Sequence, residues 1–273
     1  MLSPGRTTAS KKPPSPSTKA RAKSRAKART PPRREAPRGD APPIRGVISP
    51  EALRFIGELA RRQNRAWFEP RKEELKRLLH DPVLAVLRDA GGALIPHFPA
   101  VEDAAPRVFR IYRDVRFAKD KSPYKDHVGG TLKVGLGDVY LHVDGSGLFA
   151  AVGVYDPSPA QLAAFRQAVA DTELGPALLA TTAALERRGY TLMSIGALAR
   201  APAGYSPDHH CIRLLRLKGW ALKLPPIPVR VRADGSLGAH IARGVAQARE
   251  AIALAERAFA SQAPRGRGAP RQT

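Results

Sequence analysis

The feature that most constrains this 273-residue chain is the stretch over residues 108–155, where β-branched and aromatic residues alternate with polar ones between glycines. Such alternation is typical of strands that bury one face. It predicts strands over residues 108–117, 127–134, 139–143 and 147–154. The short connections at 135–137 and 144–146 suit hairpin turns, so we expect an antiparallel meander in the middle of the chain.

Helical spacing flanks this stretch on both sides. Ser49-Pro50 and Ser158-Pro159 each place an N-cap residue before a proline at the first helical position. A first helix is predicted to begin at Ser49, and further helices are predicted over residues 66–79, 81–92, 158–171, 175–188 and 238–259. A short strand is expected at 190–193. Residues 212–222 are apolar but show neither a helical nor a strand period, so no element is assigned to them. Along the chain, a group of helices is followed by a group of strands and then by a second group of helices. This order predicts an α+β fold in which N-terminal and C-terminal helices pack on the sheet.

The two ends of the chain have a different composition. Residues 1–45 contain five Lys and eight Arg against Glu35 and Asp40, which accounts for +11 of the net charge of +22. Chains this poor in apolar residues cannot offset the entropy lost on folding. We therefore expect a disordered basic tail over residues 1–45, rich in Pro, Ala, Lys and Arg, a single domain over residues 46–260, and a second disordered basic tail over residues 261–273.

The first tail has two interpretations. A basic, proline-punctuated segment attracts phosphates and gives weak, non-specific, salt-sensitive binding to nucleic acid. It is equally compatible with a solubilising tail that has no partner. The chain shows no apolar run of about 18 residues and no secretory leader, so we expect a cytoplasmic protein without a membrane partner.

Known cofactor and metal motifs are absent from the sequence. Cys211 is the single cysteine and stands in an apolar run, which favours a buried thiol over a reactive one. Asp208-His209-His210 favours a turn, while His80, His97, His127 and His240 stand alone. The pattern names no cofactor and assigns no metal site.

Basic residues are concentrated in the segment between Arg107 and Lys125. If residues 108–117 form a strand, Arg110, Asp114 and Arg116 share its polar face. Arg113 falls on the apolar face, where an unpaired guanidinium is costly, so it must find an acid or reach the sheet rim.

This segment has side chains suited to bind a phosphate or a carboxylate, because a planar guanidinium can donate two parallel hydrogen bonds and a lysine ammonium supplies a localised positive charge. The predicted ligand-binding residues are Arg110, Arg113, Arg116, Lys121, Tyr124 and Lys125. An internal network of Arg–Asp and Lys–Asp pairs that only fixes the loop is the alternative.

RIYRDVRFAKDKSPYK, preceded by FIGELARRQNRAWFEPRKEEL, resembles the conserved hypothetical family called domain of unknown function 2461. The resemblance extends from Ser49 to about Trp220 and rests on an RDxRFxxDKxPYK core. Ala118-Lys119 departs mildly from the family pattern, and the basic tail and the alanine-rich final helix are not features of its core. The resemblance implies no particular activity. The matching positions are Asn64, Trp67, Phe68, Arg110, Arg113, Asp114, Arg116, Phe117, Asp120, Lys121, Pro123, Tyr124 and Lys125.

A catalytic hypothesis competes with simple ligand binding. Tyr140, His142 and Asp144 share one face of a predicted strand, and with Asp114 and Asp120 they would suit an enzyme acting on a phosphorylated or nucleic-acid substrate. The candidate catalytic residues are Asp114, Asp120, His142 and Asp144, which this hypothesis places around a common point. A third hypothesis is a nucleic-acid accessory protein that binds through residues 1–45.

Overall fold

A six-stranded antiparallel sheet forms the centre of the fold, in the order β1-β2-β3-β4-β6-β5. The computed structural model describes residues 46–116, 119–171, 173–194 and 196–260, so the predicted tails lie outside the described residues. The strands are β1 (Arg107–Val108), β2 (His127–Val134), β3 (Gly137–Asp144), β4 (Gly147–Val154), β5 (Thr191–Leu192) and β6 (Trp220–Lys223). The predicted α+β class and the β2-β3-β4 meander are confirmed.

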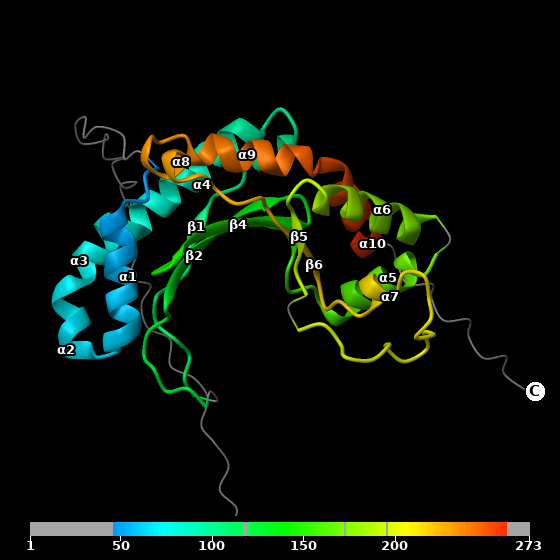
Figure 1. The fold of residues 1–273 in the computed structure, drawn as a ribbon, viewed down its shortest axis with the longest axis horizontal. Coiled ribbons are helices and arrows are strands. Elements are labelled where there is room, and N and C mark those ends of the chain that lie inside the picture. Colours follow the sequence, from blue (N-terminus) through cyan, green and yellow to red (C-terminus); the bar gives the residue numbers. More distant parts are fainter. Residues whose placement is uncertain (1–45, 117–118, 172, 195, 261–273) are drawn as a thin grey trace, which may run out of the picture. The chain divides into compact units, whose positions relative to one another are not determined.

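Helices precede and follow the meander (Figure 1). The N-terminal group contains α1 (Pro50–Arg62), α2 (Arg65–Phe68), α3 (Lys72–Leu75) and α4 (Asp81–Leu94); the later group contains α5 (Pro159–Val169), α6 (Leu174–Glu186), α7 (Ile212–Leu215), α8 (Val229–Ala233), α9 (Leu237–Gln247) and α10 (Arg249–Ala260). Short 3-10 turns occur at Glu69–Arg71 and Pro99–Val101.

The predicted N-caps of two helices are confirmed. The Ser49 hydroxyl accepts a hydrogen bond from the N–H of Ala52 at 3.1 Å, and Ser158 forms a reciprocal capping box with Gln161. Both caps satisfy backbone N–H groups that have no partner inside the helix.

Two helix boundaries differ from the prediction. The second predicted helix, residues 66–79, is divided into α2, a 3-10 turn, α3 and a wide π-turn at Lys76–His80. The π-turn leads into α4 just before Pro82, which has no N–H to donate to the preceding turn. The final helix is divided at Ala248, because α9 packs on α4 whereas α10 packs on α5 and α6.

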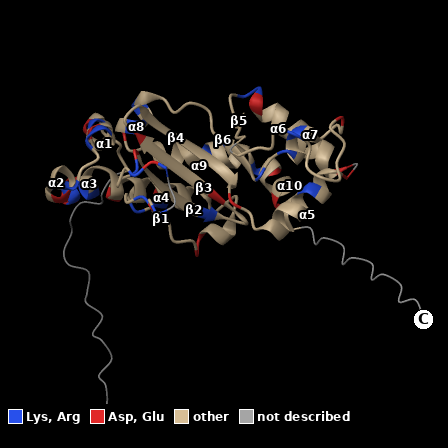
Figure 2. Ribbon diagram, turned by 90° about the horizontal axis from the view of Figure 1, so that it is seen from below, with Lys and Arg blue, Asp and Glu red and all other residues tan. Residues whose placement is uncertain are grey.

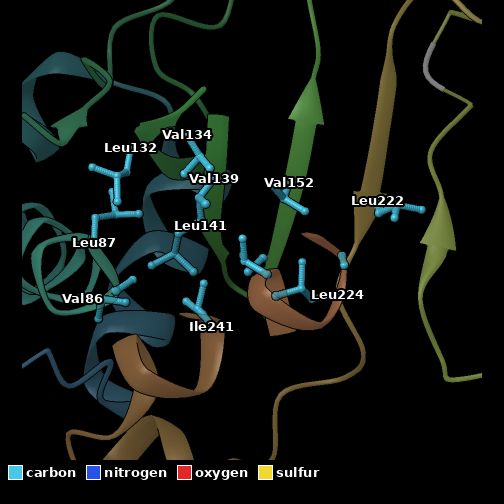
Figure 3. Packing of buried hydrophobic residues seen from close by; sticks show 14 of the residues in the cluster. Val86, Leu87, Leu132, Val134, Val139, Leu141, Val152, Leu222, Leu224 and Ile241 are labelled. Carbon is cyan, nitrogen blue, oxygen red and sulfur yellow. The ribbon is translucent and has the colours of Figure 1, made fainter. Parts of the chain in front are cut away.

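The hydrophobic core lies between the sheet and helices α4 and α9. Val139, Leu141 and Val143 of β3 are fully buried, while the residues between them are partly exposed, as the alternation predicted. Figure 3 shows Leu141 and Leu132 facing side chains of α4 and α9. The sheet therefore turns its apolar face toward these helices and leaves its polar face on the other side.

The predicted strand over residues 108–117 is wrong. Regular pairing ends at Val108, and after it a single bridge joins Tyr112 to Tyr124. Asp114 turns back to bind the backbone N–H and the guanidinium of Arg116, which bends the chain out of the extended conformation.

Gly92 in α4 offers a direct test of the helix packing. A Cβ atom added there meets no atom within 4 Å, so Gly92→Ala is expected to raise the free energy of unfolding by about 0.5–1 kcal/mol, because alanine restricts the unfolded chain. Urea unfolding of the full chain measures the change. In Gly91→Ala the new Cβ lies 3.2 Å from Leu132 Cδ2, so this control should gain less; an equal gain in both variants would contradict the packing.

Candidate functional site: the uncovered sheet face

The polar face of β2 and β3 is not crossed by a helix within the described part of the chain, and Figure 2 looks at the sheet from this side. Side chains of four neighbouring strands share the uncovered face. His127 lies opposite Asp144, His142 lies opposite Phe149, and Ala151 lies opposite Lys223. The register therefore gathers on one surface residues that are up to about a hundred positions apart in the sequence.

Residues 109–116 and 119–125 pair irregularly with each other and extend the sheet beyond β1 and β2; these two arms are called the hairpin below. Phe109 N–H donates to the Gly129 carbonyl at 2.8 Å, Arg113 N–H to the Pro123 carbonyl at 2.9 Å, and Lys125 N–H to the Ile111 carbonyl at 2.8 Å. These bonds hold most of the charged motif on the sheet, although little of it is regular strand.

Aromatic packing attaches this hairpin to the N-terminal helices. The ring of Tyr124 is buried and lies 4.5 Å from the ring of Phe68 in α2, centroid to centroid. The Tyr124 N–H donates to Oε1 of Gln63, whose left-handed backbone (φ 44°) ends α1. Tyr124, predicted as a ligand contact, therefore packs against helix α2.

Three of the predicted ligand residues have partners inside the hairpin. Arg113 pairs with Asp120, one of the two outcomes expected for it, although the strand that would have placed it on an apolar face does not form. Arg116 Nη2 lies 2.6 Å from Asp114 Oδ2. The Lys121 ammonium donates to the carbonyl of Val115 at 2.8 Å.

The pKa values of both aspartates fall below their usual range. For Asp114 the main cause is the hydrogen bond from the Arg116 side chain. For Asp120 it is the hydroxyl of Ser122, helped by Arg113. Both carboxylates therefore stay ionised at neutral pH and serve as acceptors for their partners.

Arg110 and Lys125 differ from the other predicted ligand residues. Neither forms an ion pair with a carboxylate of the described residues. Lys125 Nζ lies 5.5 Å from the centre of the Phe109 ring and Arg107 Cζ lies 5.7 Å from it. Burial and the charge of Arg110 lower the pKa of Lys125. Cations thus gather around one partly exposed aromatic ring.

The residues of β3 form a hydrogen-bonded chain. The Tyr140 hydroxyl lies 3.0 Å from His142 Nδ1, and His142 Nε2 lies 3.2 Å from Asp144 Oδ2. Asp144 Oδ1 also accepts from the hydroxyl and the N–H of Ser146, and these bonds outweigh burial and lower the pKa of Asp144. Part of its role is thus to cap the β3-β4 turn.

The four candidate catalytic residues form separate pairs. Asp114 binds Arg116, Asp120 binds Arg113, and His142 binds Asp144. In the described structure no hydrogen bond or ion pair joins either hairpin aspartate to the His142–Asp144 pair.

Sequence reasoning missed His127 and Asp126. His127 stacks on His142 with ring centroids 4.4 Å apart, and its Nδ1 lies 2.8 Å from Asp126 Oδ1. The strand alternation puts His127 on the polar face, but its neighbour across the strand depends on the register of β2 with β3. Only the length of the β2-β3 turn could have suggested that register.

One further group of potential metal ligands lies near α7. Ligand atoms of His209, His210 and Cys211 all fall within 4.8 Å of one another. Cys211 is fully buried, and burial raises the pKa of its thiol. His209 Nδ1 already accepts the N–H of Cys211. Because a protonated thiol is a poor ligand, this group is better explained as a turn.

The fold and its uncovered face define an α+β domain whose antiparallel sheet presents cations, paired acids and two stacked histidines on one side. The chain belongs to the conserved hypothetical protein family DUF2461, whose model matches residues 51–252. The match confirms the resemblance and reaches beyond Trp220 to include α9 and part of α10. No curated protein and no solved structure gives a significant match. Among the described helices, none has the length and apolar character to cross a membrane.

Proposed function

We propose that the protein binds an anionic ligand, a phosphate or a carboxylate, on the uncovered face beside Phe109. The observation that carries the proposal is the group formed by Arg107, Arg110 and Lys125, whose charges no described carboxylate pairs. The charge of Arg110 contributes to the lowered pKa of Asp114, so the two side chains are near each other. Both carboxylate oxygens of Asp114, however, are bonded to Arg116.

Electrostatics supports this interpretation. Like charges held close together oppose one another, and burial adds a cost for Lys125. A bound anion would offset both costs, because its charge attracts the two cations. A guanidinium fork and an ammonium group at a partly apolar surface form strong, charge-assisted hydrogen bonds to phosphate or carboxylate oxygens.

Ion pairs and aromatic packing position the two described arms of the hairpin. The pairs Arg113–Asp120 and Arg116–Asp114 fix its outer part, and Tyr124 attaches its base to α2. In this proposal the outer part of the segment is a structural network of Arg–Asp pairs, whereas Arg110 and Lys125 bind the ligand.

Isothermal titration calorimetry of the full chain with inorganic phosphate, and separately with acetate, tests the proposal. We expect Arg110→Ala and Lys125→Ala each to weaken binding of the preferred anion by about 10-fold to 100-fold, since a hydrogen bond to a charged group contributes about 1.5–3 kcal/mol. The two titrations show which class of anion the site prefers.

A matched control separates a local site from net charge. Arg88 in α4 is exposed and forms no ion pair within the described residues. Arg88→Ala removes the same charge as Arg110→Ala and should leave the affinity within about twofold, because α4 covers the opposite face of the sheet and exposed charges are screened at physiological salt. An equal loss in both variants, or no binding of either anion, would refute the proposed site.

A further inference from the structure

A stack of three rings crosses the uncovered face from β2 to β4. His127 lies 4.4 Å from His142, and His142 lies 4.7 Å from Phe149, with nearly parallel planes in both pairs. The ammonium of Lys223 in β6 lies 4.7 Å from the centre of the Phe149 ring. The faces of the rings therefore pack against one another, and only the nitrogen atoms at the ring edges are available for polar contacts.

Both ring nitrogens of His142 are engaged. Burial raises the pKa of Tyr140 to about 12, so the Tyr140 hydroxyl stays protonated. It donates a hydrogen bond to Nδ1 of His142. Nε2 then carries the proton and donates to Asp144. Burial and the neighbouring His127 lower the pKa of His142, in agreement with a neutral ring. His142 is thus a fixed support for the ring stacked on it.

His127 has one free nitrogen. Its Nδ1 donates to Asp126 Oδ1 at 2.8 Å, which leaves the lone pair on Nε2. No hydrogen-bond partner for Nε2 occurs within the described ranges, and 29% of the side chain is exposed. An imidazole held by a carboxylate at one nitrogen and open at the other is the arrangement of a general base.

The position of His127 connects it to the proposed anion site. Lys125 and His127 are two residues apart, and both side chains lie on the uncovered face, Lys125 against Phe109 and His127 against His142. Tyr140 links the two places, because its ring lies 6.4 Å from Phe109 and its hydroxyl binds His142. His127 and Lys125 therefore lie on the same part of the uncovered face, joined through Phe109, Tyr140 and His142.

We propose that His127 is the catalytic acid–base residue for hydrolysis of a phosphate monoester held by Arg110 and Lys125, with Asp126 and His142 as positioning residues. This inference rests on the proposed anion site. A water oxygen forms a bond to phosphorus while the ester P–O bond breaks. His127 Nε2 takes one proton from the water and returns it to the departing alcohol, so the products are the alcohol and inorganic phosphate.

The cations have the charge that this reaction needs. The phosphoryl oxygens carry the negative charge in the transition state, and arginine and lysine stabilise it. Proton transfer by a positioned histidine contributes about 100-fold to 10,000-fold. The cations and the histidine both belong to segments that contact the sheet or α2.

The test is steady-state hydrolysis of p-nitrophenyl phosphate by the full chain. His127→Ala is expected to lower kcat by about 100-fold or more, while KM changes by less than about threefold, because the base acts on the transition state and the cations bind the substrate. Imidazole added to the buffer should restore part of the activity of His127→Ala but none of that lost in Lys125→Ala. The control is His97→Ala, which changes an exposed histidine in the turn after α4.

His127→Gln provides a second variant, because its amide can still donate to Asp126; circular dichroism during heating verifies that both variants fold. If the wild type binds inorganic phosphate but hydrolyses no ester, or if His127→Gln keeps full activity, the catalytic inference is refuted and the anion site stands. If the wild type binds acetate but no phosphate, the catalytic inference is likewise refuted and the anion site stands; if it binds neither anion, both proposals are refuted. Loss of kcat with rescue by imidazole supports both.

Discussion

Replacing Phe68 by alanine is expected to lower the free energy of unfolding by about 3–5 kcal/mol, the usual cost of deleting a buried phenyl ring. Phe68 is 1% exposed, and its ring packs on Tyr124 at 4.5 Å and edge-on against Tyr112 at 6.1 Å. The cavity would open between α2 and the hairpin, so the hairpin should also exchange its amide hydrogens faster. Urea unfolding measures the stability, and hydrogen exchange followed by mass spectrometry locates the change.

Tyr124→Phe is the matched control for this prediction. It removes only a hydroxyl, which makes no hydrogen bond to any described residue, and should cost less than about 1 kcal/mol. A loss below about 1 kcal/mol in Phe68→Ala would show that the aromatic contact does not hold the hairpin. The same control tests the sequence-based prediction for Tyr124, since a loss of phosphate affinity in Tyr124→Phe would mean that its hydroxyl contacts the ligand.

Gly153→Ala is expected to be the second severe change, with a loss of more than about 3 kcal/mol. Gly153 has φ +149° in β4, and an added Cβ would lie 2.2 Å from the carbonyl oxygen of Trp220 and 2.5 Å from Ala221 Cα. These are backbone atoms of β6 and cannot move without separating the strands. Urea unfolding measures the loss, and far-ultraviolet circular dichroism shows whether the sheet persists.

Gly204→Ala separates the steric contact from the backbone angle. Gly204 has φ +85°, but a Cβ there meets no atom within 4 Å, so only the cost of the left-handed conformation remains, about 1–2 kcal/mol. If the two variants lose equal stability, the close approach of β4 and β6 is not what makes Gly153 necessary.

Much of the fold was predictable from local patterns. The meander was visible because each of its strands buries one face, and its turns are short enough to permit few registers. The Ser-Pro pairs identified two helix starts because capping is a local interaction. In contrast, Ala248 carries no signal that ends a helix; the division there follows from the different partners of α9 and α10.

The candidate site was predictable only in part. The composition of residues 107–125 identified a charged segment. An acid or the sheet rim was expected for Arg113, and its partner is Asp120, although the strand on which that expectation rested does not form. The sequence could not show which cations stay without an acid, because Asp114 binds Arg116 through a bend that alternation does not predict. Nor could it place His127 beside His142, since that contact belongs to the strand register.

The position of β6 has a consequence for synthesis on the ribosome. β6 pairs with β4 across an interval of more than sixty residues, and α9 covers α4 from still later in the chain. While these late segments are being made, the meander has an unpaired edge at β4, and the apolar side of α4 lacks its cover. Non-local closure of this kind slows folding and exposes aggregation-prone surface in the interim. A nascent chain that has passed Val154 therefore depends on the arrival of its last helices before its sheet is protected.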